Sequence, residues 1–366
     1  MHFHCTLADL LPAISLVEKA VASQNNIPII TGIHIAAAND QLTLTATNLE
    51  LGIKSVINAH VVKANQIVVD GKLLAAIVRK LPDNPVIFEL VNQQLVITSG
   101  NVEFSLNTFE GEDFPQLPQG EDLLFSITAK QFIKMVKNTI FACGKDDRRP
   151  FLNGVLFELN DSRLSLVATD INRLAFYSDQ VESSHKGNKE LLVPMKTLQE
   201  IIRSIPADDT RIDVYYSNNY LIFEYGKNMI TTRLIDDQFP RYKSLFPKDE
   251  PIQITVNRQI LASAVERASL IDSDDGSQIV IFDASNGVLE ITTPASSKGR
   301  SMEKINVEHK GENGRAAFSA KYIMDMLKAT DAEQVLFHFN SDLRQCLLKA
   351  DTDEDQKYIL MPIRLS

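Results

Sequence analysis

Residues spaced for catalysis are few in this sequence. The phosphate-binding pattern GxxxxGK[ST], the dinucleotide pattern GxGxxG, the zinc pattern HExxH and the nucleophile pattern GxSxG are all absent from it. Asp170 and Arg173 have the charges and the spacing of a pair in a site, but a turn stabilised by Asp170 with a local ion pair explains the same spacing. Asn48, at the corresponding position of an earlier segment, favours the turn. We therefore expect no enzyme activity and no cofactor.

Metal-binding side chains are also sparse. His2 and His4 share one face of an expected strand and hint at a metal site, but we interpret them as ordinary strand residues. Cys5, Cys143 and Cys346 show no CxxC spacing, and we expect each to be a buried free thiol. The sequence therefore predicts neither a metal site nor a disulfide.

Composition suits a globular protein. The 366 residues are 44% hydrophobic and 23% charged, with a net charge of −10. No basic segment followed by an apolar core opens the chain, and no apolar run approaches the roughly 18 residues of a membrane span. We expect a cytoplasmic protein with no membrane partner. The acidic balance by itself disfavours nucleic acid as a partner, because phosphate binding requires Lys and Arg.

The elements that position the side chains repeat three times. Segments VDGKLLAAIVRKLPDN, VPMKTLQEIIRSIPAD and FSAKYIMDMLKATDAE begin at Val69, Val193 and Phe318. Each predicts an amphipathic helix, because apolar residues recur along one stripe. The stripe consists of Leu74, Ile77 and Val78 in the first copy, Leu198, Ile201 and Ile202 in the second, and Ile323, Met326 and Leu327 in the third.

This repeat predicts three domains of one architecture, 1–121, 122–247 and 248–366. Strands with alternating apolar residues surround each helix, with turns at Asn39–Asp40, Asn92–Gln93 and Gly100–Asn101. The fold class is therefore α+β, with two helices per domain packed on antiparallel sheets. The expected helices are 7–23, 70–81, 128–142, 194–205, 256–270 and 319–329.

Cations gather on these helices although the protein is acidic. The six helices carry a net charge of +7, which leaves −17 for the rest of the chain. Two interpretations stay open: a solvated face neutralised by pairs such as Lys196 with Glu200 and Lys321 with Asp325, or non-specific contact with phosphates. The candidate phosphate-contacting residues are Lys72, Arg79, Lys130, Lys134, Lys137, Lys196, Arg203, Arg258, Lys321 and Lys328.

The C-terminal segment YILMPIRLS leaves apolar side chains near the chain end. If Met361 and Ile363 are exposed beside Leu174 or Phe239–Pro240, they mark a groove for peptides. A last strand that completes its sheet explains the segment equally well. The residues alone do not choose between the two.

Six motifs occur in an order and spacing that resemble a known family: IPIITGI, LTATNLE, FLNGVLFE, ATDINRLAF, LIDDQFPRY and MPIRL. From Phe3 to Leu365 the chain resembles the bacterial replicative DNA polymerase β sliding clamp. The resemblance implies a head-to-tail homodimer whose six domains form a ring around double-stranded DNA, without reading bases. It also implies binding of the polymerase catalytic subunit, the clamp loader and repair proteins through short linear peptides.

The resemblance also assigns contact residues. The dimer contact is carried over to Phe104 and Leu106 of one chain and to Leu270 and Ile271 of the other. Glu103 near one edge, with Lys298 and Arg300 near the other, adds opposite charges. The peptide groove is carried over to Arg149, Leu152, Thr169, Asn172, Arg173, Leu174, Pro240, Leu245, Tyr322, Leu343, Met361, Pro362, Ile363 and Arg364, with apolar side chains for the peptide's anchors and arginines for its polar end.

Three positions depart from the family pattern. Gln24 stands where an arginine that touches DNA is frequent, Asn172 stands where histidine is common, and Ser366 extends the tail. These departures keep an alternative open, a clamp paralogue that recruits partners or confers inhibitor tolerance without being the main replication clamp. An enzyme that uses Asp170 and Arg173 ranks below both hypotheses.

Overall fold

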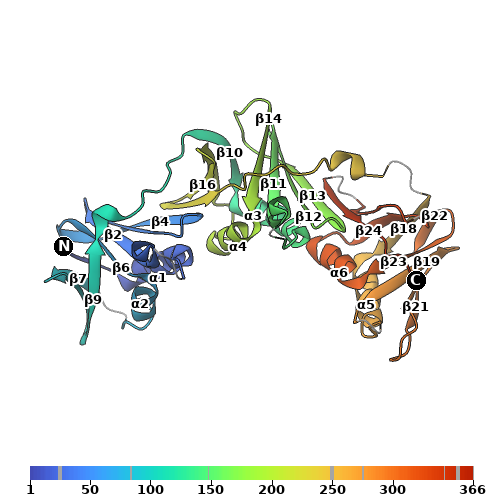
Figure 1. The fold of residues 1–366 in the computed structure, drawn as a ribbon, viewed down its shortest axis with the longest axis horizontal. Helices are drawn as coiled ribbons and strands as arrows, with labels where there is room; N and C mark the ends of the chain where they lie inside the picture. The colour runs from blue at the N-terminus through green and yellow to red at the C-terminus, as the bar shows by residue number, and fades with distance from the viewer. Residues whose placement is uncertain are drawn as a thin grey trace. The chain divides into compact units, whose positions relative to one another are not determined.

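The computed structural model describes residues 1–366 except 24–26, 83–84, 147, 248–250, 274–275, 342, 352–354 and 366. The departures at Gln24 and Ser366 therefore lie outside the described residues. The chain divides into two compact units. Figure 1 labels helices and strands of both. The first comprises Met1–Phe132, Glu182–His185 and Lys196–Leu234, and the second comprises Ile133–Val181, Lys186–Met195 and Ile235–Ser366.

The first unit contains one antiparallel sheet of 13 strands, flanked by helices α1 (Leu7–Val17) and α2 (Gly71–Val78). Helix α4 (Met195–Ser204) also belongs to it, apart from its first residue. In spatial order the strands are β10 (Asp122–Thr128), β15 (Arg211–Ser217), β16 (Tyr220–Tyr225), β17 (Asn228–Arg233), β4 (Leu51–Asn58), β3 (Gln41–Thr47), β2 (Gly32–Ala38), β6 (Asn65–Asp70), β9 (Val102–Glu110), β8 (Gln94–Ser99), β7 (Val86–Val91), β1 (His2–Cys5) and β5 (His60–Lys63).

The second unit contains two antiparallel sheets, with α5 (Arg258–Ala268) and α6 (Ala320–Ala329). Helix α3 (Ala129–Lys137) begins in the first unit and ends in the second. The nine-stranded sheet has the order β14 (Asn188–Pro194), β11 (Gly154–Asn160), β12 (Arg163–Thr169), β13 (Arg173–Gln180), β26 (Gln356–Leu360), β25 (Cys346–Ala350), β24 (Gln334–Phe339), β18 (Ile252–Asn257) and β22 (Glu308–Gly311). The four-stranded sheet has the order β21 (Met302–Asn306), β20 (Val288–Thr292), β19 (Ile279–Ser285) and β23 (Gly314–Ser319).

The predicted α+β class is confirmed, as is the apolar stripe. Eight of its nine side chains are buried, and Ile202 alone among them is half-buried. Burial of this stripe stabilises each helix by roughly 1.5–3 kcal/mol per large side chain. The predicted hairpin turns are confirmed too, since Asn39 and Asp40 (φ 52° and 53°) and Asn92 and Gln93 (φ 48° and 64°) adopt the left-handed conformations that tight turns require.

Five of the predicted helices end earlier than expected, whereas α6 ends at Ala329 as predicted. In α3, polar side chains compete for the backbone carbonyls. Helix α3 was expected to reach residue 142 but ends at Lys137. There the Asn138 side-chain amide donates to the Lys134 carbonyl (2.7 Å), and the Thr139 hydroxyl donates to the Met135 carbonyl (3.1 Å). A short 3-10 turn, Ile140–Ala142, follows and places Phe141 next to β13.

Candidate functional site

The turn between β12 and β13 repeats the turn between β3 and β4. In the second unit the Asp170 carboxylate accepts from the backbone N–H groups of Asn172 (3.1 Å) and Arg173 (3.0 Å). In the first unit the Asn48 side-chain oxygen accepts from Glu50 (3.0 Å) and Leu51 (2.8 Å) in the same way. The turn interpretation of Asp170 is therefore confirmed.

The same turn supports an apolar side chain in an unusual backbone conformation. Ile171 has φ 82° and Leu49 has φ 75°, a region that branched side chains seldom adopt. Thr169 and Thr47 brace the two turns, because each hydroxyl accepts from the N–H group two residues on and donates to the carbonyl four residues on. Ile171 is exposed and lies between the predicted groove residues Thr169 and Asn172.

Arg173 is a buried connector, with 6% of its surface exposed. Its guanidinium donates to Asp170 (3.0 Å), to Asp325 of α6 (2.6 Å) and to the Phe141 carbonyl (2.7 Å). It also lies over the Tyr322 ring, 4.3 Å from its centroid. Because three donors and one face of the guanidinium are occupied, Arg173 joins three segments. That it frames the polar end of a peptide stays a prediction.

The C-terminal tail lies beside this connector. The Met361 N–H donates to the Asn172 carbonyl (2.8 Å), and the Ile363 N–H donates to the Ala317 carbonyl (2.7 Å). Met361 is 39% exposed, whereas Leu174, which stands across from Ile359 in the strand register, is only 2% exposed. The structure therefore brings Asn172, Arg173, Tyr322 and Met361 together, with Leu174 as part of the underlying core.

The remaining candidate groove residues divide by exposure. Leu152 and Thr169 are buried, and Pro362 and Ile363 are half-buried. Arg149 is exposed and donates to Asp146 (2.9 Å). The others are exposed: Asn172, Pro240, Leu245, Leu343 and Arg364.

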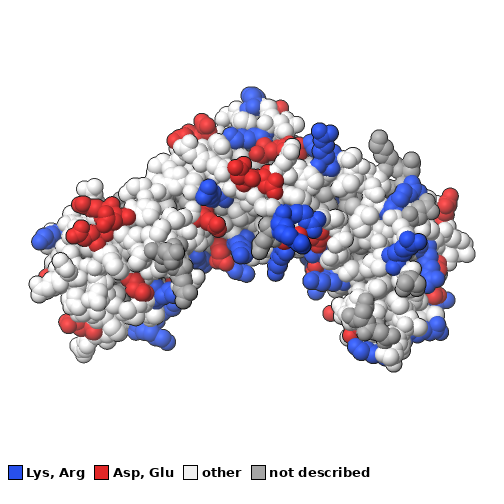
Figure 2. Space-filling view, viewed as in Figure 1, with Lys and Arg blue, Asp and Glu red and all other residues white. Residues whose placement is uncertain are grey.

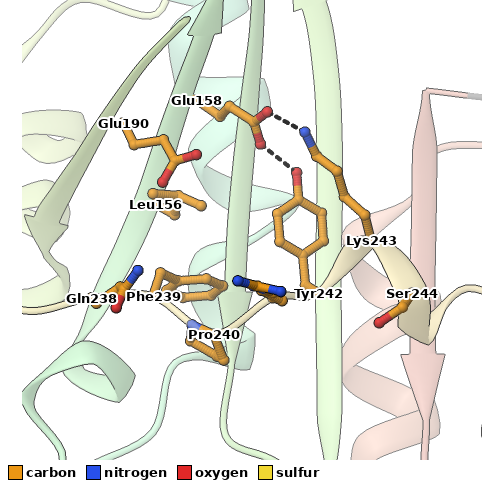
Figure 3. Close-up of a pocket in the computed structure, with 10 residues that line it drawn as sticks. Leu156, Glu158, Glu190, Gln238, Phe239, Pro240, Tyr242, Lys243 and Ser244 are labelled. Atoms are coloured by element: carbon orange, nitrogen blue, oxygen red, sulfur yellow. Dashed lines mark hydrogen bonds and ion pairs between the residues drawn. The ribbon is translucent and has the colours of Figure 1, made fainter.

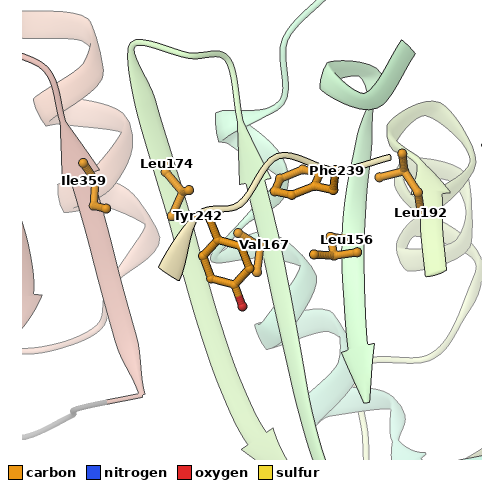
Figure 4. Close-up of a cluster of buried hydrophobic side chains, with 7 residues drawn as sticks. All are labelled: Leu156, Val167, Leu174, Leu192, Phe239, Tyr242 and Ile359. Atoms are coloured by element: carbon orange, nitrogen blue, oxygen red, sulfur yellow. The ribbon is translucent and has the colours of Figure 1, made fainter. Parts of the chain in front are cut away.

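Residues 238–246, here called the strap, cross the face of the nine-stranded sheet. Phe239 and Tyr242 are buried against Leu156, Leu174 and Ile359 (Figure 4). Further members of this cluster are Val167 and Leu192, with Phe151, Phe176, Ile235 and Phe246 packed around it. The predicted groove residues Pro240 and Leu245 are exposed on the strap, so their placement depends on its buried residues.

Nine of the ten candidate phosphate contacts are exposed, namely Lys72, Arg79, Lys130, Lys134, Lys137, Lys196, Arg203, Lys321 and Lys328. Arg258 differs, because its half-buried guanidinium donates to the carbonyls of Ala332 (2.9 Å) and Leu327 (3.2 Å). It therefore completes the C-terminal end of α6. Basic and acidic side chains are interspersed over the face drawn in Figure 2. The drawn face therefore shows no surface that is basic throughout.

The acidic residues named in the solvated-face interpretation pair with other cations than the ones considered there. Glu200 pairs with Arg203 (2.9 Å), and Asp325 turns inward to Arg173. A buried guanidinium requires a carboxylate partner, and this requirement decides the orientation of Asp325. An additional pair joins Arg79 to Glu18, which the sequence did not predict.

The candidate dimer residues differ in exposure. Leu270 is 79% exposed, Phe104 is exposed, Ile271 is half-buried and Leu106 is buried. Within the described residues, β21 pairs with β20 alone, and the segment 102–107 of β9 pairs with β8 alone. Lys298 forms an ion pair with Asp272 (2.8 Å), which lowers the pKa of that carboxyl. Glu103 and Arg300 are exposed.

The three cysteines are free and buried, as predicted. Burial raises the pKa of Cys5, Cys143 and Cys346 to about 12 each. His4 stacks on His60 of β5 (centroids 4.7 Å apart). No group of three or more His, Cys, Asp or Glu suited to a metal occurs in the described part of the chain. Nor does any helix described here have the length and apolarity to cross a membrane.

Sequence reasoning missed Tyr242, Glu158 and Asp325. Tyr242 lies in the motif LIDDQFPRY, so its presence was visible but its burial was not. Glu158 interrupts the apolar run of β11, and this interruption was a usable signal for a buried polar contact.

Comparison with known proteins identifies relatives along the whole chain. Models of the DNA polymerase III beta subunit match as N-terminal domain (residues 1–118), central domain (126–241) and C-terminal domain (243–364). The beta sliding clamps of Bacillus subtilis (strain 168) and Pseudomonas aeruginosa are 29% and 28% identical, each over 100% of both chains. The crystal structure of the Bacillus subtilis sliding clamp matches with a TM-score of 0.97 at 28% identity, covering 100% of each chain. The beta subunit structure from Thermotoga maritima matches with a TM-score of 0.90 at 28% identity, again covering 100% of each.

Proposed function

This chain belongs to the DNA polymerase III beta subunit family, and from that membership we propose how its surfaces act. It is a sliding clamp, a processivity factor for DNA replication and not an enzyme. Similarity over the full length favours this function over that of a paralogue. We propose that the chain forms three domains, 1–121, 122–247 and 248–366, that two chains close head to tail into a ring around duplex DNA, and that it works in the cytoplasm.

The exposed cations of the repeated helices are the observation that supports DNA contact. Lys and Arg attract phosphates without selecting a sequence, so the ring slides while its closure prevents escape. Arg258 is left out of this proposal because its donors are occupied. Loaded clamp should remain on closed circular DNA and leave after the circle is cut. Equal retention on cut and closed circles would refute topological tethering.

Partner peptides are proposed to bind near the start of β13, beside which both the tail and the strap lie. Met361 of the tail and Leu245 of the strap offer exposed apolar surface, and Leu174 and Leu152 are buried. The proposed ligands are short linear peptides of the polymerase catalytic subunit, the clamp loader and repair proteins.

A labelled peptide from the polymerase of the same organism tests the groove. Met361→Ala with Leu245→Ala should weaken its binding about tenfold or more, as expected for central apolar contacts. Val62→Ala with Leu123→Ala removes exposed apolar side chains elsewhere and serves as the control. Equal loss in both double variants, or no loss in the first, would exclude these groove residues.

The ring contact is proposed to join β9 and its Phe104 and Leu106 to the region of Leu270 and Ile271. Two strand segments with unpaired edges, 102–107 and β21, are suited to extend a sheet from one chain to the next. Leu270→Glu should convert the dimer to the 40.9 kDa chain in solution, whereas Val62→Glu should not. A dimer that persists in Leu270→Glu would place the contact elsewhere.

A further inference from the structure

One carboxylate fixes the middle of the strap. Glu158 of β11 is 7% exposed and accepts a hydrogen bond from the Tyr242 hydroxyl (2.7 Å). Its other oxygen forms an ion pair with Lys243 (Figure 3). A buried carboxylate is unfavourable unless such partners satisfy it. Burial and the nearby Glu158 carboxylate raise the pKa of the Tyr242 hydroxyl, which keeps it protonated and able to donate.

Apolar packing holds the rings of Phe239 and Tyr242, whereas the Tyr242 hydroxyl and the Lys243 ammonium have Glu158 as their partner. A cavity of about 520 Å³ lies beside the strap, lined by Leu156, Glu158, Glu190 and the strap itself. Glu190 of β14 stands directly across from Glu158 in the strand register. In Figure 3 no hydrogen bond or ion pair joins Glu190 to the strap residues drawn, whereas Glu158 is joined to Tyr242 and Lys243. The contacts of Glu158 therefore add to that packing by fixing the polar ends of Tyr242 and Lys243 beside the cavity.

The buried residues of the strap determine where its exposed residues stand. Tyr242 packs in the same cluster as Leu174, and the Leu245 N–H donates to the Tyr242 carbonyl (2.9 Å). Pro240 lies between the buried Phe239 and Tyr242. A shift of Tyr242 would therefore move both Pro240 and Leu245 relative to Leu174.

We propose that Glu158 is a positioning residue for partner peptides, which acts through Tyr242 and Lys243 and does not touch the peptide. The inference rests on the proposed groove. Loss of the Glu158 contacts leaves the sheet paired but lets the strap move away from Leu174, so peptides dissociate faster. Glu158 itself is outside the predicted groove residues, so its effect reaches the groove through the strap.

Paired variants of the two opposed glutamates test this role in the full-length dimer. Glu158→Leu should weaken binding of the labelled polymerase peptide about tenfold, mainly through faster dissociation. This factor corresponds to the loss of one hydrogen bond to a charged group. Glu158→Gln keeps an acceptor for Tyr242 and should recover most of the affinity. Glu190→Leu, the matched control on the same cavity, should bind like wild type.

Several outcomes decide the question. Thermal unfolding measured alongside separates stability from positioning, because a role in stability alone lowers the unfolding temperature and leaves peptide dissociation unchanged. That result, or equal effects at Glu158 and Glu190, would overturn the proposal. If Glu158→Leu does not fold, Tyr242→Phe keeps the carboxylate paired with Lys243 and must still speed peptide dissociation. Wild-type protein that fails to bind the peptide refutes the groove itself, whereas wild-type binding unchanged in Tyr242→Phe refutes the role of Glu158 alone.

Discussion

Replacing Arg173 by methionine should loosen three segments at once. The change removes the partner of Asp325 and one partner of Asp170 while preserving much of the side-chain volume. Removing one member of a buried ion pair costs about 3–5 kcal/mol, because the remaining charge stays without compensation. Arg163→Met is the matched control: Arg163 also pairs with an aspartate, Asp355, but is exposed, so its loss should cost about 0–1 kcal/mol.

Hydrogen exchange followed by mass spectrometry measures this difference locally, which matters because a chain of several domains need not unfold in one step. With tenfold per 1.4 kcal/mol, Arg173→Met should speed exchange roughly a hundredfold or more in segments 139–143, 169–174 and 320–329. Arg163→Met should change exchange in β12 about fivefold or less. Similar small changes in both variants would refute the argument that Arg173 is a buried connector.

Three further predictions follow from the described contacts. Replacing the three exposed lysines of α3 by alanine should weaken the salt dependence of binding to a linear DNA duplex, which fluorescence anisotropy measures. At about 0.9 per phosphate contact, the slope of log affinity against log salt concentration should become smaller by up to about 2.7. The same change at Lys63, Lys186 and Lys310 should leave that slope nearly unaltered, and equal slopes in both triple variants would place DNA elsewhere. Thiol reagents should not label the native protein at pH 8, because a raised pKa keeps each cysteine protonated, and rapid native labelling would contradict the burial. The thiols of the unfolded chain ionise near pH 9, but those of the folded chain ionise only near pH 12. The free energy of unfolding should therefore decrease as the pH rises from 9 to 12. Gln356 joins Thr330 (2.7 Å) to Asn138 through buried hydrogen bonds. Gln356→Leu should therefore lower the free energy of unfolding by about 1–3 kcal/mol for each partner that stays buried without a hydrogen bond. An unchanged midpoint of urea unfolding would count against that network.

The local pattern of apolar and turn-forming residues was enough to predict the repeated helices, the hairpin turns and the α+β class. Apolar spacing at Leu74, Ile77 and Val78 specifies a buried helix face wherever that helix packs, and Asn39–Asp40 requires a tight turn in any fold. The motifs carried the family resemblance in the same way. These features depend on residues near one another in the chain.

Tertiary structure decided the partners of the charged groups. Asp325 could pair with Lys321 four residues away by one of the two interpretations of the sequence, yet it pairs with Arg173, which is 152 residues away. Glu158 likewise finds Tyr242 and Lys243 across the sheet. An exposed local ion pair contributes little, whereas a buried charge without a partner costs several kcal/mol, so long-range burial determines which pairs form. The sequence by itself determined the helices, turns and family of this protein; the fold alone determined whether each cation faces solvent, caps a helix or connects buried segments.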